Sequence, residues 1–228
     1  MLTVCSFWVL RPEEHPKAPD YLPMLRILQR SCDALGLQHV VLTDPHTAPL
    51  AIDAGMSAFA TELPQPLMQA CTEAHARWLE TWTTTDTLFV GADAILLDDP
   101  DRHFPAEPDL CVTARRPRPL LDAINNGAML VRRRAVDRAA ALYRRVADRC
   151  GPVWRDDQKA LVAELSPVPL TPGTHERAGL SVGFLPMARF NQTPLWPGDP
   201  CKGALLLHFK GKNAKRIMPL WAKRHGFG

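Results

Sequence analysis

The stretch TDTLFVGADAILLDDP, residues 85–100, holds a short apolar run, an isolated acid and a second apolar run. The first run, residues 88–90, consists of β-forming residues and is typical of a strand buried on both faces. It ends at Gly91, and the carboxylate of Asp93 follows. A charged group between two buried runs is costly unless a turn, a metal ion or a bound ligand compensates it. The stretch therefore predicts a central strand followed by an acid that either caps a turn or binds a ligand.

The segments around this stretch alternate between strand and helix patterns. Residues 2–10 predict a buried strand, residues 21–35 an amphipathic helix ending at Gly36, and residues 39–42 a second strand. Strand, helix and strand within about 45 residues indicate a βαβ unit with parallel strands. The other expected elements are helices at 67–82, 132–149, 159–165 and 217–225, strands at 110–113, 128–131, 180–184 and 204–209, one short strand with loops at 48–63, and loops at 11–20 and before residue 180.

Composition limits the class of protein. The 228 residues are 46% hydrophobic and show no repeat or linker, so residues 1–228 are expected to form one α/β domain. A net charge of +3 permits an anionic ligand without requiring nucleic acid. The six cysteines contain no CxxC pair, which argues against a zinc finger and for reduced thiols. Without an apolar run of about 18 residues or a signal-peptide pattern, the protein is expected to be cytoplasmic with no membrane span.

Two features have structural explanations that compete with functional ones. The arginines of residues 132–149 are expected to line a solvated helix face, with nucleic-acid contact as the alternative. His75 lies on the apolar face of the expected helix at 67–82, so it is predicted to be a packing residue rather than a ligand.

Further polar motifs follow Gly91-Ala92-Asp93 near the boundaries of the expected elements. They are Asn-Asn-Gly at 125–127, Asp-Gln at 157–158, Leu-Pro-Met-Ala-Arg-Phe-Asn at 185–191, and His-Phe-Lys-Gly at 208–211 with Lys212 and Lys215. In this order the motifs resemble the glycogenin-like and bacterial galactosyltransferase-like enzymes of the GT-A class, glycosyltransferase family eight. The resemblance covers most of the chain from residue 85 onward. It implies a GT-A α/β fold with a mostly parallel central sheet flanked by helices.

The resemblance also implies an activity. Such enzymes move a sugar from a nucleotide-diphosphate sugar, here expected to be a uridine diphosphate (UDP) sugar, with retention of anomeric configuration. A divalent ion, Mn²⁺ or Mg²⁺, would neutralise the departing diphosphate. By the resemblance, Asp93 and His208 would hold this ion, and Asp157 would also stabilise positive charge near the anomeric carbon. The expected donor-binding residues are Ala92, Lys210, Gly211, Lys212 and Lys215, and the residues expected to hold the sugar hydroxyls are Asn125, Asp157 and Gln158.

One residue departs from the family pattern, because Gly91 stands where the first acid of Asp-x-Asp is expected. This leaves open a metal site completed by water, a site using Asp98 or Asp99, weaker metal dependence, or an inactive domain. Asp98 and Asp99 have turn capping as their simpler explanation. Purely structural roles also remain open for the other site residues. His208 could be a packing residue, Asp157 a helix cap, and the lysines part of a solvated surface.

Two other functions compete with the glycosyltransferase. The first is a non-catalytic nucleotide-sugar or nucleic-acid-binding module, motivated by Gly91 and by the arginines of residues 132–149. The second is a nucleotidyltransferase, which is disfavoured because the segment after Leu10 has no glycine for a phosphate loop. The acceptor, whether saccharide, lipopolysaccharide, protein or modified DNA, is not specified by the sequence, nor are the sugar and the oligomeric state.

Overall fold

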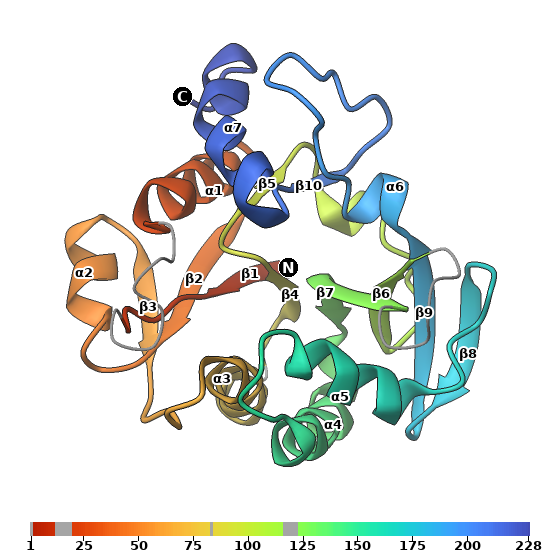
Figure 1. Cartoon of the computed structure of the whole chain (residues 1–228). Helices are drawn as coiled ribbons and strands as arrows, with labels where there is room; N and C mark the ends of the chain where they lie inside the picture. The colour runs from red at the N-terminus through yellow and green to blue at the C-terminus, as the bar shows by residue number, and fades with distance from the viewer. Residues whose placement is uncertain (1, 12–19, 83, 116–122) are drawn as a thin grey trace.

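The computed structural model describes residues 2–11, 20–82, 84–115 and 123–228, built around an eight-stranded sheet of order β3-β2-β1-β4-β7-β6-β9-β8 (Figure 1). Strands β3, β2, β1 and β4 are mutually parallel, which confirms the predicted amino-terminal βαβ unit. Strand β7 is antiparallel to β4 and β6, while β6 and β9 are parallel. Most of the loop expected at 11–20 lies outside the described residues. The strands are β1 (Leu2–Phe7), β2 (Gln38–Thr43), β3 (Ser57–Ala60), β4 (Asp86–Val90), β6 (Leu110–Ala114), β7 (Ile124–Val131), β8 (Gly173–Arg177) and β9 (Leu180–Pro186).

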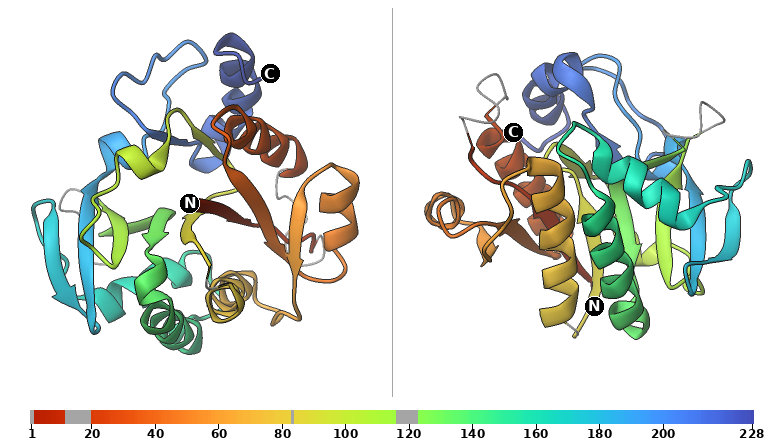
Figure 2. Two further views of the ribbon diagram at one scale, coloured as in Figure 1. Left: turned by 180° about the vertical axis from the view of Figure 1, so that it is seen from behind. Right: turned by 60° about the horizontal axis from the view of Figure 1, so that its bottom comes forward.

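Helices cover both faces of the sheet, as Figures 1 and 2 show. Helices α3 (Leu67–Thr81), α4 (Val136–Arg149) and α5 (Asp156–Leu165) pack together on one face. The other face carries α1 (Leu22–Ala34) and a two-stranded ribbon of β5 (Ala94–Leu96) and β10 (Leu206–His208). The ribbon is followed by α7 (Gly211–Arg224), and α6 (Met187–Phe190) lies beside it.

Strand β4 is buried on both faces, as its apolar run predicts. Phe89 points toward α3 and α4, with its ring 4.2 Å from that of His75 and 5.6 Å from that of Tyr143. Leu88 points the other way and shares a cluster with Leu28 of α1. His75 is therefore a packing residue, as predicted, and burial lowers its pKa to about 3.

The sequence patterns missed several elements, among them helix α2 (Ala48–Asp53) and strand β8. Residues 48–53, expected to be loop, form α2, which begins with a proline in its first turn. Strand β8 lies in the segment expected to be a proline-rich loop before residue 180. It is an exposed edge strand that pairs with β9 through its backbone, so its polar sequence shows no apolar alternation.

The starts of α7, β7 and α5 differ from the prediction near the polar motifs. Helix α7 begins at Gly211 rather than at residue 217, because its buried face already includes Ala214. Strand β7 begins at Ile124, so the Asn-Asn-Gly motif lies inside a strand rather than before one. Helix α5 begins at Asp156, which places the Asp-Gln motif in its first turn.

Across the described ranges, no helix combines the length and apolar character that crossing a bilayer requires.

Candidate active site

Asp93 and His208 meet because two short strands pair beside the sheet. Strands β5 and β10 run antiparallel, with Ala94 opposite His208, and the backbone N–H of Phe209 donates to the carbonyl of Asp93 at 2.9 Å. Asp93 lies just beyond the carboxyl end of β4, the edge where α/β sheets bind ligands. Asp93 Oδ1 is 3.0 Å from His208 Nε2. The structure thus brings together the two residues predicted as metal ligands.

Lys215 completes this cluster from the second turn of α7. Its ammonium Nζ is 2.6 Å from Asp93 Oδ2 and donates to the hydroxyl of Tyr21 at 2.5 Å. The same nitrogen lies 4.4 Å from the centre of the Tyr21 ring, within range of a cation–π interaction. Burial alone would raise the pKa of Asp93, which is 4% exposed, but His208 and Lys215 outweigh it and hold that pKa well below its usual value.

Asn191 orients His208 from behind. Its amide Nδ2 donates to Thr113 Oγ1 at 2.8 Å and to Asn125 Oδ1 at 2.7 Å. Since both amide protons are used, Asn191 Oδ1 faces His208 Nδ1, 3.0 Å away, as an acceptor. Both ring nitrogens of His208 therefore face acceptors: Nδ1 faces Asn191 Oδ1 and Nε2 faces Asp93 Oδ1. Asn191 is fully buried, so this arrangement is fixed by the protein interior.

Glycines at two positions make room for the imidazole. A Cβ on Gly127 would lie 1.8 Å from His208 Nδ1. A Cβ on Gly91 would lie 2.7 Å from Asp93 Oδ1 and 2.9 Å from His208 Nε2. The missing acid at position 91 is therefore tied to the close approach of Asp93 and His208, because a side chain there would push them apart.

A divalent ion, which the resemblance implies, can be tested against these donors. Mg²⁺ and Mn²⁺ prefer oxygen ligands in near-octahedral geometry. The protein would offer Asp93 Oδ1 and His208 Nε2, while the ammonium of Lys215 holds the other oxygen of Asp93. Asp98 and Asp99 accept hydrogen bonds within their own turn. No group of three or more His, Cys, Asp or Glu side chains placed to hold an ion occurs in the described part of the chain. The residues present do not fit a preformed divalent-ion site.

A second polar cluster lies on the opposite face of β7. Because successive strand side chains face opposite ways, Asn125 points toward His208 and Asn126 points toward α5. Asn126 Nδ2 donates to Asp157 Oδ2 at 2.9 Å. Among the described residues, buried Asn126 Oδ1, Asp157 Oδ1 and Gln158 Oε1 find no hydrogen-bond partner. Burial raises the pKa of Asp157. Unsatisfied acceptors are costly, and they suit the hydroxyl donors of a ligand.

The beginning of α7 is a third polar region, and it is positively charged. Gly211 has a φ of +79°, which suits glycine, and the side chain of the N-cap residue, Lys210, does not cap the first amides of this helix. Lys210 donates to the carbonyl of Asn191 at 2.7 Å. Burial, together with the neighbouring charge of Arg115, lowers the pKa of Lys210 to about 7. Lys212 is exposed. Clustered cations beside a helix amino terminus favour an anionic ligand.

The remaining predicted residue, Ala92, is buried in an apolar cluster with Trp8, so its side chain adds no polar group. Reasoning from sequence missed Asn126, Thr113 and Tyr21 as members of the site. Asn126 adjoins a predicted residue, but only the strand register shows that it faces Asp157. Tyr21 carries no signal, because its spacing is also that of the apolar face of α1.

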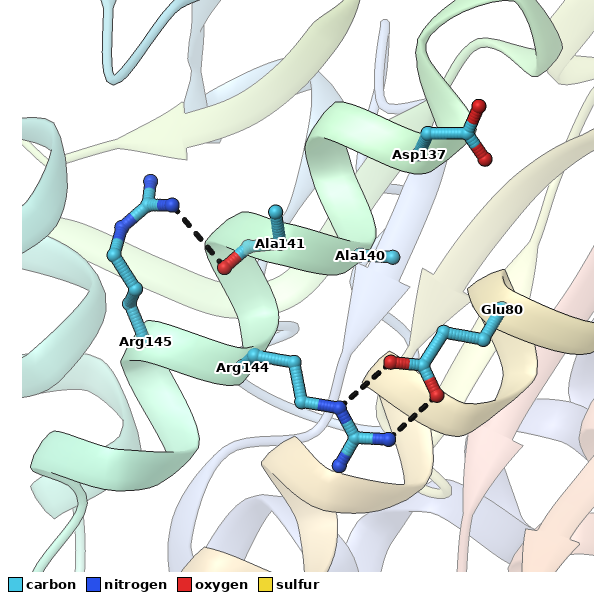
Figure 3. A pocket seen from close by; sticks show the side chains of 6 residues that line it. All are labelled: Glu80, Asp137, Ala140, Ala141, Arg144 and Arg145. Atoms are coloured by element: carbon cyan, nitrogen blue, oxygen red, sulfur yellow. Dashed lines mark hydrogen bonds and ion pairs between the residues drawn. The ribbon is translucent and has the colours of Figure 1, made fainter.

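The arginines of α4 are engaged with acids. Arg144 bridges Glu73 and Glu80 of α3, and Arg145 and Arg149 both pair with Glu164. Figure 3 shows a shallow depression over α4 and α3, in which Arg144 binds both carboxylate oxygens of Glu80. These pairs support the solvated helix face rather than a nucleic-acid surface.

Several solved structures share the fold of this chain. A glycosyltransferase involved in glycosylation of the major capsid of PBCV-1 matches with a TM-score of 0.60 and 13% identity over 96% of this chain and 98% of its own. The galactosyltransferase LgtC, solved with donor and acceptor sugar analogues, matches at 0.55 and 12% over 98% and 96%. Mouse xyloside xylosyltransferase 1 matches at 0.55 and 10% over 93% and 98%.

The chain has the GT-A fold. No protein-family model and no curated protein sequence matches it. At 10–13% identity the likeness of this GT-A chain to the solved structures establishes the fold alone. Family eight and the roles of individual residues remain predictions.

Proposed function

We propose that the protein is a glycosyltransferase that takes a sugar from a nucleotide-diphosphate sugar, with a UDP-sugar as donor and retention of configuration. The observation that carries the proposal is the buried cluster of Asp93, His208 and Lys215 at the carboxyl end of β4, beside the beginning of α7. Charged groups gathered at this edge of an α/β sheet suit a diphosphate. The donor and the stereochemistry rest on the motif resemblance.

In the proposed reaction, the bond between the anomeric carbon and the β-phosphate oxygen breaks, and its electron pair stays on the phosphate. The acceptor hydroxyl bonds to the same face of that carbon, and its proton passes to the departing phosphate. Lys210, Lys215 and the first amides of α7 stabilise the negative charge that develops on this leaving group. No protein nucleophile is required.

The sugar itself is assigned to the cluster on the other face of β7. The unsatisfied oxygens of Asn126, Asp157 and Gln158 would accept hydrogen bonds from sugar hydroxyls. Asp157 would also stabilise positive charge near the anomeric carbon. Asn125 was predicted to share this task, but its Oδ1 already accepts from Gly127 N–H and Asn191, so we propose that it supports His208 instead.

The proposal is tested by titrating the protein with UDP and UDP-sugars in a calorimeter and by following release of UDP. Wild type is expected to bind UDP and to release it from at least one UDP-sugar. Asp93→Asn should lower the release rate by about 100-fold, because it removes the counter-ion that positions the Lys215 ammonium, and loss of one positioned donor to a developing charge costs about that much. The matched control is Asp98→Asn, an exposed turn residue, which should behave as wild type. Absence of UDP binding under all conditions would contradict the proposal.

A second candidate, a non-catalytic nucleotide-sugar-binding module, is favoured by the glycine at position 91. It predicts binding of UDP-sugars without release of UDP or transfer to any acceptor. Measurable donor hydrolysis that disappears in Asp93→Asn would exclude it.

A further inference from the structure

The negative charge of the Asp93 carboxylate is neutralised by neighbouring residues, without a metal ion. In an Asp-x-Asp site, two carboxylates and a dication sum to zero. Here Gly91 removes one carboxylate, and the ammonium of Lys215 pairs with the remaining one at 2.6 Å. Lys215 thus neutralises this carboxylate without a metal ion, and His208 Nε2 faces the other carboxylate oxygen at 3.0 Å, so both oxygens of Asp93 have partners in the protein.

We propose that Lys215, rather than a divalent metal ion, supplies the cation that Asp93 positions against the donor diphosphate. This inference rests on the proposed function and specifies its cofactor requirement. The transfer would then proceed without added metal, and the lysine would carry the charge stabilisation that the resemblance assigns to Mn²⁺ or Mg²⁺.

Lys215 is held in place before any ligand arrives. Its side chain is 14% exposed, lies against the Tyr21 ring and donates to the Tyr21 hydroxyl. Helix α7 is anchored by Met218 and Trp221, which are buried in one cluster with Phe209, the residue that follows His208. A fixed ammonium needs no ordering when the diphosphate binds, and preorganised charge is what stabilises a leaving group.

The space around Gly91 supports the same assignment. A side chain at this position would collide with Asp93 Oδ1 and His208 Nε2. A second acid therefore cannot enter while these two side chains keep their present contact. Asp98 and Asp99 are held in their own turn and do not replace it.

Dependence on metal is measured first on the wild-type protein. UDP affinity by calorimetry and UDP release from a UDP-sugar are compared in excess EDTA and with added Mn²⁺. Both are expected to differ by less than about tenfold between the two conditions. Binding or turnover that requires Mn²⁺ would overturn the inference and leave the glycosyltransferase proposal intact. Absence of binding and turnover in both conditions would overturn both.

A series of variants then tests whether Lys215 supplies the positive charge. Lys215→Met is expected to lower UDP release by about 100-fold in EDTA, without rescue by Mn²⁺, and Lys215→Arg should retain more activity than Lys215→Met. The matched control is Lys223→Met, an exposed lysine at the other end of the same helix, which should act as wild type. Equal activity of Lys215→Met and wild type would overturn the inference. If Lys215→Met fails to fold, the comparison of wild type with Lys215→Arg in EDTA decides, because a metal-dependent site would lose activity in both.

Discussion

The two polar clusters that flank β7 differ in how their hydrogen bonds are satisfied. On one face, Asp93 uses both carboxylate oxygens and Asn191 uses both amide protons within the protein. On the other face, Asp157 and Gln158 keep acceptors that no described residue satisfies. A network whose hydrogen bonds are all made within the protein is preorganised, whereas unsatisfied acceptors can bind the donors of a ligand. The Asp93 side therefore suits a charged leaving group, and the Asp157 side suits sugar hydroxyls.

A substitution that breaks the hydrogen-bonded cluster around Asp93 should have the largest effect on stability. Asp93→Asn leaves the largely buried ammonium of Lys215 without its counter-ion and should lower the free energy of unfolding by about 3 kcal/mol. Because the folded pKa of Asp93 is lowered, its contribution is complete above the unfolded value near 4 and is lost as pH falls toward the folded value. Urea unfolding at neutral and acid pH measures this. A destabilisation that persists unchanged in acid would contradict the explanation.

The next largest effect is expected where Gly127 leaves room for the His208 imidazole. Gly127→Ala would force His208 away from Asn191 and should cost about 2 kcal/mol of stability through overpacking, together with loss of UDP release. Gly173→Ala on β8 is the matched control, because its added Cβ would make only an ordinary contact of 3.5 Å. Thermal unfolding and a donor-release assay compare the two variants. Equal behaviour would show that His208 is not confined as described.

On the side of Asp157, a substitution should raise the free energy of unfolding instead of lowering it. Asp157→Asn removes a buried carboxylate whose pKa is raised by burial, so it should stabilise the protein by about 1 kcal/mol at neutral pH while lowering turnover. A raised folded pKa gives stability at low pH that is lost as pH rises through that pKa, so the advantage of the variant should grow with pH. Asp156→Asn is the neighbouring control. Its pKa is lowered, chiefly by Lys159, and this variant should gain no stability.

The smallest effect is expected on α4. Replacing Arg145 and Arg149 by alanine removes two partly exposed ion pairs to Glu164 and should cost less than about 1 kcal/mol. Retention of an oligonucleotide on a gel should be unchanged. A marked loss of nucleic-acid binding would revive the arginine-rich surface as a functional one.

Much of the fold follows from local pattern. The apolar run before Gly91 defines the central strand, and the spacing of buried residues defines α1, α3 and α4. Strand β8 was missed because it is held by backbone pairing at the sheet edge rather than by apolar alternation. Helix α2 was missed because it is short and shows only a proline in its first turn, without apolar periodicity. The beginning of α7 was placed too late because its lysines resemble a solvated loop.

The site was predictable only in part. Motif order indicated that Asp93 and His208 would be neighbours, since both appear in motifs of one resemblance. The pairing of Lys215 with Asp93 and Tyr21 depends on the rotation of α7, and the contact of Asn126 with Asp157 depends on strand register. Neither is written in local sequence, because a one-residue shift would reverse which side chain faces which cluster.

A crystal structure of the UDP complex, grown with EDTA, tests the central claim most directly. The account predicts that the diphosphate lies within hydrogen-bonding distance of the Lys215 ammonium and beside the first amides of α7. UDP bound elsewhere, or bound here only after Mn²⁺ is supplied and coordinated by Asp93 and His208, would contradict it.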